Sequence, residues 1–393
     1  MLVLEILLWC GLFSIFYTYL FYPKGLQLLA KNKKLKYDLI PISNLPKISI
    51  VMAAYNEEKV IEQKIRSVFN GNYPNELIDF WVGSDCSTDA TNEILTKLSQ
   101  EYPTLKIHLF TERQGKTTMI NRFLKDVPND IIISTDANNI FFKNTIHELV
   151  SAISSDENIG LVDMQTINNN LNSEGSSEQE NTYTIQEAMT KHCEGILFGV
   201  IGCPFGGCYI YRKKLWIDVP VTFLGDDFTV CMYVLRQGYK TIANLNAKTF
   251  EDVSNNPILD FRRKIRISTS NFQNLFYFPK EFLNPFSKIG FVMFSHKTIR
   301  WLGPFILLFV LIATIFLSFD NMFYKIFLGI EMFSLLVCLL DLLLRKFNIH
   351  LFLLKHLTHF YVAQIAMIIG LYKYIVGVKT SIWSPTQRFQ NAK

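Results

Sequence analysis

Apolar runs of membrane-spanning length lie at both ends of the sequence, and none lies between residues 40 and 280. The first run covers residues 2–22, and its one charged residue is Glu5. Three more candidates follow near the C-terminus, at 301–319, 323–344 and 353–376. Each approaches the ~20 apolar residues that a spanning helix needs. The expected protein is therefore a globular domain held by membrane anchors.

Charges beside these runs predict the orientation. The first run has no basic segment before it and no small-residue cleavage site, so a retained anchor is expected rather than a signal peptide. Lysines follow it at Lys31, Lys33, Lys34 and Lys36, and Arg345 and Lys346 follow the run 323–344. Basic flanks mark the cytoplasmic side, so we expect a multi-pass protein of the cell membrane with a cytoplasmic domain. The net charge of +5 is modest, and no nucleic-acid partner is expected.

These features divide the chain into five regions: an N-terminal transmembrane helix (1–22), a cytoplasmic domain (40–255), amphipathic interface helices (256–300), C-terminal transmembrane helices (301–378) and a tail (379–393). The fourth region holds two or three spans. Three would place Lys379, Arg388 and Lys393 outside, against the charge rule. The seven cysteines are odd in number and form no CxxC pair, which favours free thiols in a reducing compartment.

The cytoplasmic region alternates short β-rich runs with helical ones. The β-rich runs are "KISIVMAA", "LIDFWVGS", "LKIHLF" and "DIIIST", and the helical runs are 57–70, 88–101 (with Ser87 or Thr88 as N-cap) and 116–125. This rhythm predicts an α/β domain with a mostly parallel, Rossmann-like sheet and helices on both faces. Ligands of such sheets bind beyond the carboxyl ends of the strands.

Polar residues stand where three of these strands end. Residues 54–57 follow the first strand, Ser84 and Asp85 end the second, and Asp136 and Asn138 end the last. Each alone fits a structural cap, but three that converge on one edge indicate a binding site. "RQGKTT" is not a phosphate-binding P-loop, because Phe110 stands where that motif needs a glycine.

In order and spacing, these motifs resemble family 2 glycosyltransferases, the inverting GT-A enzymes that include cellulose, chitin and hyaluronan synthases. The resemblance covers about residues 47–275 and rests on "VMAAYNEE", "GSDCSTDAT", "RQGKTTMIN", "TDAN" and "LGDDFTVCMYVLRQGY". It implies a GT-A fold and a nucleotide sugar as substrate, with the acid of the second motif reading the uracil or ribose. The implied nucleotide-binding residues are Ala54, Tyr55, Glu57, Asp85, Lys116 and Asp136.

"TDAN" occupies the place of the DxD motif, which implies a divalent metal on the nucleotide diphosphate. Mg²⁺ and Mn²⁺ prefer oxygen ligands and keep waters and phosphate oxygens in their shell. Asp136 and Asn138 therefore suffice as protein ligands. Asn138 departs from the commoner second acid, so weaker binding of free metal is expected.

Inverting transfer needs a base that takes the proton of the attacking hydroxyl. Asp227 matches the base by its position in the ED-like segment. Asp226 replaces the usual glutamate, and its like charge is expected to raise the pKa of its neighbour. The alternative makes these two acids the N-cap and first turn of the following helix. Both interpretations can hold together.

Two further segments concern the acceptor. "IGCPFGGCYIYRKKLW" resembles the acceptor-side loop, which implies that Phe205, Gly206 and Gly207 lie near the sugar; a tight turn before a strand is the alternative. The polar segment 166–181 predicts a surface loop without chemistry.

The segment "DFRRKIRISTSNFQ" departs from the QxxRW motif of polymer-making relatives. The positions of its Gln, Arg and Trp are occupied by Arg263, Arg266 and Ile267. Arg266, assisted by Arg263 or Lys264, is expected to cradle diphosphate, and Gln273 is grouped with these acceptor or diphosphate residues. The alternative is a basic helix on anionic lipid, with Phe272 and Phe276 on its apolar face. The missing Trp removes a stacking platform and weakens the case for processive polymerisation.

The sequence thus predicts a membrane-bound inverting glycosyltransferase that moves a sugar from a UDP-sugar to a hydroxyl of a growing polysaccharide or glycan. One alternative is transfer of a single sugar to a lipid or lipid-linked acceptor, and another is a non-catalytic nucleotide-binding relative. The identity of the transferred sugar stays open. Whether the protein forms a dimer or has an export partner stays open as well.

Overall fold

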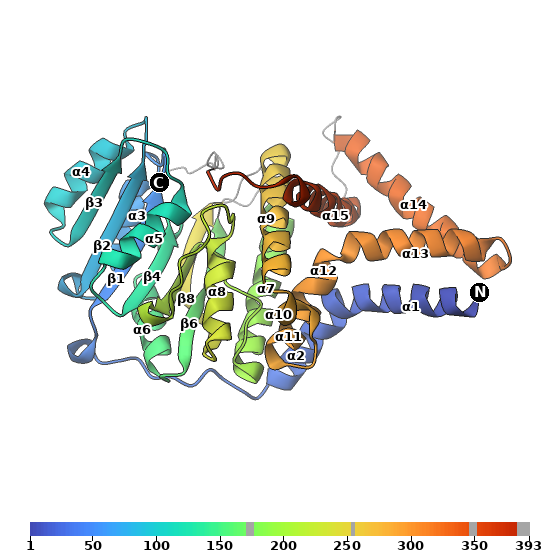
Figure 1. The fold of residues 1–393 in the computed structure, drawn as a ribbon, viewed down its shortest axis with the longest axis horizontal. Helices are drawn as coiled ribbons and strands as arrows, with labels where there is room; N and C mark the ends of the chain where they lie inside the picture. Colours follow the sequence, from blue (N-terminus) through green and yellow to red (C-terminus); the bar gives the residue numbers. More distant parts are fainter. Residues whose placement is uncertain (170–176, 253–255, 346–351, 383–393) are drawn as a thin grey trace. The chain divides into compact units, whose positions relative to one another are not determined.

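The computed structural model describes residues 1–169, 177–252, 256–345 and 352–382. It divides into two compact units (Figure 1). The sheet unit comprises Leu26–Leu171, Glu180–Asn255 and Gly377–Lys393, and the helical unit comprises Met1–Gly25, Asn172–Gln179 and Asn256–Val376. Residues 170–176 of the predicted loop 166–181 and residues 383–393 of the predicted tail lie outside the described residues. At its two ends the loop prediction is wrong, because residues 166–169 belong to strand β6 (Ile159–Asn169) and residues 177–181 belong to helix α7 (Ser177–Phe198).

The sheet unit is built on one sheet with the order β3-β2-β1-β4-β7-β6-β8-β5. Its strands are β1 Ile48–Ala54, β2 Ile78–Asp85, β3 Leu105–Phe110, β4 Ile131–Asp136, β5 Ile140–Phe141, β6 Ile159–Asn169, β7 Cys208–Arg212 and β8 Lys240–Asp252. Strands β3, β2, β1 and β4 are mutually parallel, as predicted. Strand β7 runs antiparallel between β4 and β6, so the complete sheet is mixed.

Helices pack on both faces of this sheet, as predicted. They are α3 Ile61–Phe69, α4 Thr91–Glu101, α5 Lys116–Asp126, α6 Thr145–Ser154, α7 Ser177–Phe198 and α8 Asp226–Arg236. Helices α3, α4 and α6 share one hydrophobic core with β1, β2 and β4, and in Figure 1 α4 lies beside β3 at the edge of the sheet. On the other face, Gly83 of β2 lies against Phe123 of α5, and Gly160 of β6 lies against Val234 of α8. The three isoleucines of β4, at 131–133, are buried because both faces are covered.

One local prediction is wrong. Neither Ser87 nor Thr88 is the N-cap of α4, which begins at Thr91 after Ala90. Both residues instead hydrogen-bond to Asn56 in the loop after β1. A polar residue before a helical run predicts a cap only when no long-range partner competes for it.

The helical unit holds most of the remaining helices, and α2 has residues in both units. These helices are α1 Leu2–Phe16, α2 Tyr22–Ala30, α9 Pro257–Tyr277, α10 Pro279–Leu283, α11 Lys288–Met293, α12 Ile299–Trp301, α13 Gly303–Ser318, α14 Met322–Arg345 and α15 Phe352–Val376. The two units also contain short helical segments of other kinds: the π-helical η1 Tyr17–Phe21 and η5 Phe294–Thr298, and the 3₁₀-helical η2 Ile42–Asn44, η3 Asn75–Leu77 and η4 Lys213–Leu215. Leu8 of α1 packs on Val310 of α13 in a small apolar core. Gly370 allows α15 to contact α9, because an added Cβ would lie 2.5 Å from Ser268.

Three helical stretches of the described residues are long and apolar enough to cross a membrane: Leu2–Ala30, Met322–Leu344 and His356–Val376. The expected span at 301–319 is the 16-residue helix α13. With Lys288–Trp301 it forms a pair bent by 60°, which is either a broken span or a re-entrant loop. The number of C-terminal spans and the side of the membrane therefore stay predictions.

Candidate active site

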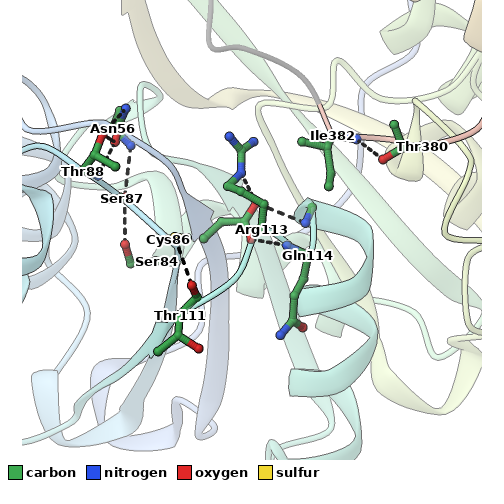
Figure 2. Close-up of polar contacts among 12 residues, drawn as sticks. Asn56, Ser84, Cys86, Ser87, Thr88, Thr111, Arg113, Gln114, Thr380 and Ile382 are labelled. Atoms are coloured by element: carbon green, nitrogen blue, oxygen red, sulfur yellow. Dashed lines mark hydrogen bonds and ion pairs between the residues drawn. The ribbon is translucent and has the colours of Figure 1, made fainter.

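The loops after β1 and β2 are tied together at the carboxyl edge of the sheet (Figure 2). The backbone N–H of Asn56 donates to Ser87 Oγ (3.1 Å), and the N–H of Thr88 donates to Asn56 Oδ1 (2.8 Å). Asn56 has a left-handed φ of 53°. Tyr55 and Glu57 flank it, so the structure brings these two predicted nucleotide-binding residues to the same edge, directly after Ala54.

Asp85, at the end of β2, is buried against the turn that precedes α5. Its carboxylate accepts from Arg113 Nε (3.0 Å), Gln114 N (2.6 Å) and Gly115 N (3.1 Å). The guanidinium of Arg113 lies over the ring of Tyr55, 3.4 Å from its centroid. Asp85 thus supports the turn, and its predicted contact with a nucleotide base or ribose stays a prediction.

A C-terminal segment, predicted from the sequence to be a tail, packs on the same turn (Figure 2). In Figure 2, Ile382 lies beside Gln114. A Cβ added to the next residue, Gly115, would lie 3.2 Å from Ile382 Cγ1 and 3.3 Å from Ser381 Oγ. Ser381 is buried. This approach needs the glycine, whose φ is +83°. Nothing in the tail sequence signals it, since the contact joins residues far apart in the chain.

Lys116, the first residue of α5, bridges two acids. Its Nζ lies 2.9 Å from Asp136 Oδ1 and 3.2 Å from Asp226 Oδ1. Burial disfavours the charged amine, but the attraction of Asp136 and Asp226 outweighs it and raises the pKa of Lys116 above its ordinary value. The ammonium group therefore stays charged and holds β4 and α8 together at the site.

Asp227 lies beside this cluster, in the first turn of α8, after the N-cap Gly225. The first-turn interpretation is thus confirmed, whereas neither acid is the N-cap. Burial raises the pKa of the Asp227 carboxyl to about 7, and repulsion from Asp226 is the second largest cause. A carboxylate with such a pKa is suited to accept a proton near neutral pH.

The predicted acceptor loop passes between Asp227 and the turn after β4. Gly206 has a φ of +75°, and a Cβ there would lie 2.5 Å from Asp227 Oδ2. A Cβ on Gly207 would collide with the side chain of Asn139, and Gly207 O accepts from Asp136 N (2.9 Å). Close packing against both neighbours, beyond a tight turn, explains the two glycines.

The residues predicted to hold a metal lie on the turn after β4. The side chain of Asp136 is 39% exposed, so its carboxylate is accessible. Asn138 donates its amide N–H to Glu251 Oε1 of β8 (3.0 Å). No group of three or more His, Cys, Asp or Glu side chains suited to a metal occurs in the described ranges. Two hard oxygen donors fit a metal that takes its other ligands from phosphates and water.

Sequence reasoning missed a buried ion pair behind the acceptor loop. Lys191 of α7 pairs with Asp163 of β6, and their side chains are 1% and 0% exposed. The Lys191 ammonium also lies 3.5 Å from the ring centroid of Phe205, whose N–H donates to Asp163 Oδ1 (3.3 Å). An acid in the middle of the apolar strand "IGLVDM" was the available signal.

Lys64 of α3 was also missed. Its buried Nζ donates to Thr135 Oγ1 (2.9 Å) and to Asn139 O, and lies 3.5 Å from the centroid of the Phe141 ring. Burial lowers the pKa of Lys64 to about 7. Its helical spacing from Ile61 places it on the apolar face of α3, which was the signal.

The remaining predicted residues lie on α9, in the helical unit. Arg263 and Lys264 both pair with Asp260 of the same helix, and Gln273 is buried. The roles of Arg263, Arg266 and Gln273 toward diphosphate stay predictions. The lipid-facing position suggested for Phe272 is wrong, because its side chain is 1% exposed.

Residues 49–219 match the family described as Glycosyl transferase family 2. The chain is also similar over nearly its whole length to the mannosyltransferase PcManGT from Pyrobaculum calidifontis, solved in complex with GDP-Man and Mn²⁺. That match has a TM-score of 0.69 at 17% identity and covers 95% of this chain and 99% of the other. At this identity it shows the fold alone, and the predicted GT-A fold is confirmed.

Among curated relatives, the probable glycosyltransferase YdaM of Bacillus subtilis is 31% identical over 124 residues, which cover 31% of this chain and 30% of YdaM. Beta-monoglucosyldiacylglycerol synthase of Nostoc sp. is 38% identical over 96 residues, 24% of this chain and 20% of that protein. Poly-beta-1,6-N-acetyl-D-glucosamine synthase of Staphylococcus aureus is 23% identical over 220 residues, 53% of this chain and 52% of the synthase. The matches thus span about half or less of these relatives.

Proposed function

Because residues 49–219 form a glycosyl transferase family 2 domain, we propose that this protein is a membrane-bound inverting glycosyltransferase. It takes a sugar from a nucleotide sugar, UDP-linked as the motifs imply, and transfers it to a hydroxyl of a growing glycan or a lipid. We place this reaction at the cytoplasmic face of the cell membrane.

One observation carries the proposal: Lys116 joins Asp136 to Asp226, next to the raised-pKa carboxyl of Asp227. Acids of different function thus lie in one cluster at the carboxyl edge of the sheet, where ligands of α/β folds bind. The raised pKa of the buried Asp227 carboxyl favours an enzyme over a non-catalytic nucleotide-binding relative, because perturbed pKa values gather at catalytic sites.

In the proposed reaction, the acceptor hydroxyl attacks the anomeric carbon while the bond to the nucleotide diphosphate breaks. Asp227 takes the hydroxyl proton, and attack on the face opposite the leaving group inverts the configuration. Gly206, which has no side chain, allows the acceptor loop to approach the Asp227 carboxylate closely. Phe205, held by the Lys191–Asp163 pair, is proposed to contact the acceptor sugar.

Asp136 and Asn138 are the residues that would hold the divalent metal, Mg²⁺ or Mn²⁺. When bound, it would neutralise charge on the leaving diphosphate. The Mn²⁺ in the complex of the structurally similar mannosyltransferase supports a divalent metal as cofactor. Lys116 keeps Asp136 in place through its ion pair.

Two acceptor classes have support from relatives. One relative is named as a synthase of a polysaccharide, and another is named as a synthase of a glucosyldiacylglycerol. Ile267, in the place of a stacking Trp, favours addition of a single sugar. Synthesis and export of a polymer would require a second copy of the protein or an export partner, because the described residues contain few candidate membrane spans to form a channel.

The decisive experiment compares the protein with Asp227→Asn, which is close to isosteric. Purified protein in detergent is given Mn²⁺, membrane lipid and labelled nucleotide sugars, GDP-mannose among them. Turnover should collapse in the variant while binding of the nucleotide diphosphate survives. Unchanged turnover would remove Asp227 from the role of base.

Sizing the products of the same reactions separates the two acceptor classes. A high-molecular-weight product would identify a polymer synthase in which Ile267 replaces the stacking Trp. A glycolipid with one added sugar would identify a single-step transferase.

A further inference from the structure

The amide of Asn138 has a defined orientation in the structure. Its Nδ2 donates to Glu251 Oε1 over 3.0 Å, across 113 residues of sequence. An ionised carboxylate only accepts hydrogen bonds, so the amide atom that faces Glu251 is the nitrogen. The amide oxygen, on the same carbon, is therefore turned away from Glu251.

The position of Glu251 is itself fixed by the sheet. Strand β8 pairs antiparallel with β5, with Ile140 opposite Phe250 and Phe141 opposite Thr249. Thr249 Oγ1 also donates to Asn139 Oδ1 (2.9 Å). The end of β8 is thus attached to the turn after β4 at the residues that follow Asn138.

We infer that Glu251 is a positioning residue for the metal, which fixes the amide of Asn138 with its oxygen toward the metal side. This rests on the proposed function, since it assigns the orientation of one proposed ligand. Partners that orient a ligand commonly change metal affinity by about tenfold to a hundredfold when they are removed. An asparagine needs such a partner because its two ends differ, whereas an aspartate presents oxygen on both.

The same contact explains a departure from the commoner motif. A second acid at position 138 would bring two carboxylates to about 3 Å, where their like charges repel. The pair formed by Asn138 and Glu251 therefore carries one negative charge, and that charge lies on Glu251 of β8 instead of on residue 138.

The test is a double-mutant cycle on the full chain in detergent. The variants are Glu251→Gln, Asn138→Asp and the double variant, with Glu251→Leu to remove the acceptor and Glu93→Gln as control. Glu93 is an exposed acid of α4 outside the candidate site. Binding of Mn²⁺ alone is followed by electron paramagnetic resonance, and binding of UDP with and without Mn²⁺ by calorimetry.

Glu251→Gln should weaken Mn²⁺ binding in the native background, because a glutamine offers either end to Asn138 and no longer selects its orientation. In the Asn138→Asp background the same change should strengthen Mn²⁺ binding by about tenfold, because the new amide at position 251 donates to the introduced carboxylate and holds it in place, where Glu251 would push it away. Glu251→Leu should lower the affinity for Mn²⁺ by about tenfold or more. The control should match the native protein.

The test compares the effect of Glu251→Gln on Mn²⁺ affinity in the two backgrounds, Asn138 and Asp at position 138. If Glu251→Gln changes Mn²⁺ affinity in the same direction and by the same factor in both backgrounds, Glu251 does not orient Asn138. This holds even if Glu251→Leu fails to fold, since the two glutamine variants keep a polar side chain. A native protein that binds UDP with no dependence on Mn²⁺ would instead contradict the metal role in the proposed function.

Discussion

The backbone of Gly206 approaches Asp227 so closely that an added Cβ would lie 2.5 Å from Oδ2 of the carboxylate. No side chain fits there without moving the candidate base. The contact joins the acceptor loop to the first turn of α8, so the geometry of the base depends on a residue without a side chain.

Gly206→Ala should lower kcat by about a hundredfold, since displacement of a catalytic group by about 1 Å has effects of that size. Gly238→Ala is a matched control. Gly238 also has a positive φ, +83°, but an added Cβ meets nothing within 4 Å. Gly238→Ala should introduce similar backbone strain but leave kcat unchanged. Equal losses in both variants would assign the effect to strain alone.

The pH dependence of transfer should report Asp227. Its pKa is raised to about 7 by burial and by Asp226, and only the deprotonated form is a base. Below that pKa, kcat/KM should therefore fall about tenfold per pH unit, and above it the profile should level off. Asp226→Asn removes the repulsion and should move the profile to lower pH. A profile that stays in place would exclude Asp226 as a cause.

Asp136→Ala should abolish the effect of Mn²⁺ on UDP binding, because the carboxylate is the only charged metal ligand proposed. The dissociation constant measured by calorimetry with Mn²⁺ should approach the value measured in a chelator. Asp218→Ala removes an exposed acid that pairs with Lys125 and should retain the Mn²⁺ effect. Retention of that effect in Asp136→Ala would reject Asp136 as a ligand.

Lys191→Met should destabilise the protein by about 3–5 kcal/mol, because it leaves the carboxylate of Asp163 buried without its partner. Adding Asp163→Asn should recover part of the loss, since the buried charge is then gone. The free energy of unfolding can be followed by tryptophan fluorescence in denaturant. A double variant that is no more stable than Lys191→Met would contradict this account.

Lys64 should make stability depend on pH. The folded protein releases its proton near pH 7, because burial lowers the pKa from 10.5. The unfolded chain keeps that proton, so it binds more protons in this window, and stability should rise with pH by up to ~1.4 kcal/mol per unit. Lys64→Met should remove this part of the slope between about pH 7 and 9. Equal slopes in both proteins would show that Lys64 is not the source.

Much of the fold and several site residues are predictable from local patterns. The strand "DIIIST" and the acid that follows it can be identified because an apolar run and a polar end are both readable within a few residues. Motifs point to Asp136, Asp227 and Lys116, and the structure brings all three to one cluster.

The partners of these residues are not predictable, because the contacts join distant segments. Asn138 meets Glu251 across 113 residues, and Lys64 reaches Thr135 across 71. Gly115 meets Ile382 at the other end of the chain. A sequence pattern records which positions are apolar, but it does not record which polar groups share a buried space.

The sequence by itself determined the alternation of strands and helices, the apolar ends of the chain and the places where chemistry-bearing residues leave the sheet, because side-chain periodicity is a local property. Only the tertiary structure decided which acids share Lys116, why Gly206 has no room for a side chain and how Asn138 is oriented. These depend on distances across the sheet, and through burial and charge those distances set the pKa of Asp227.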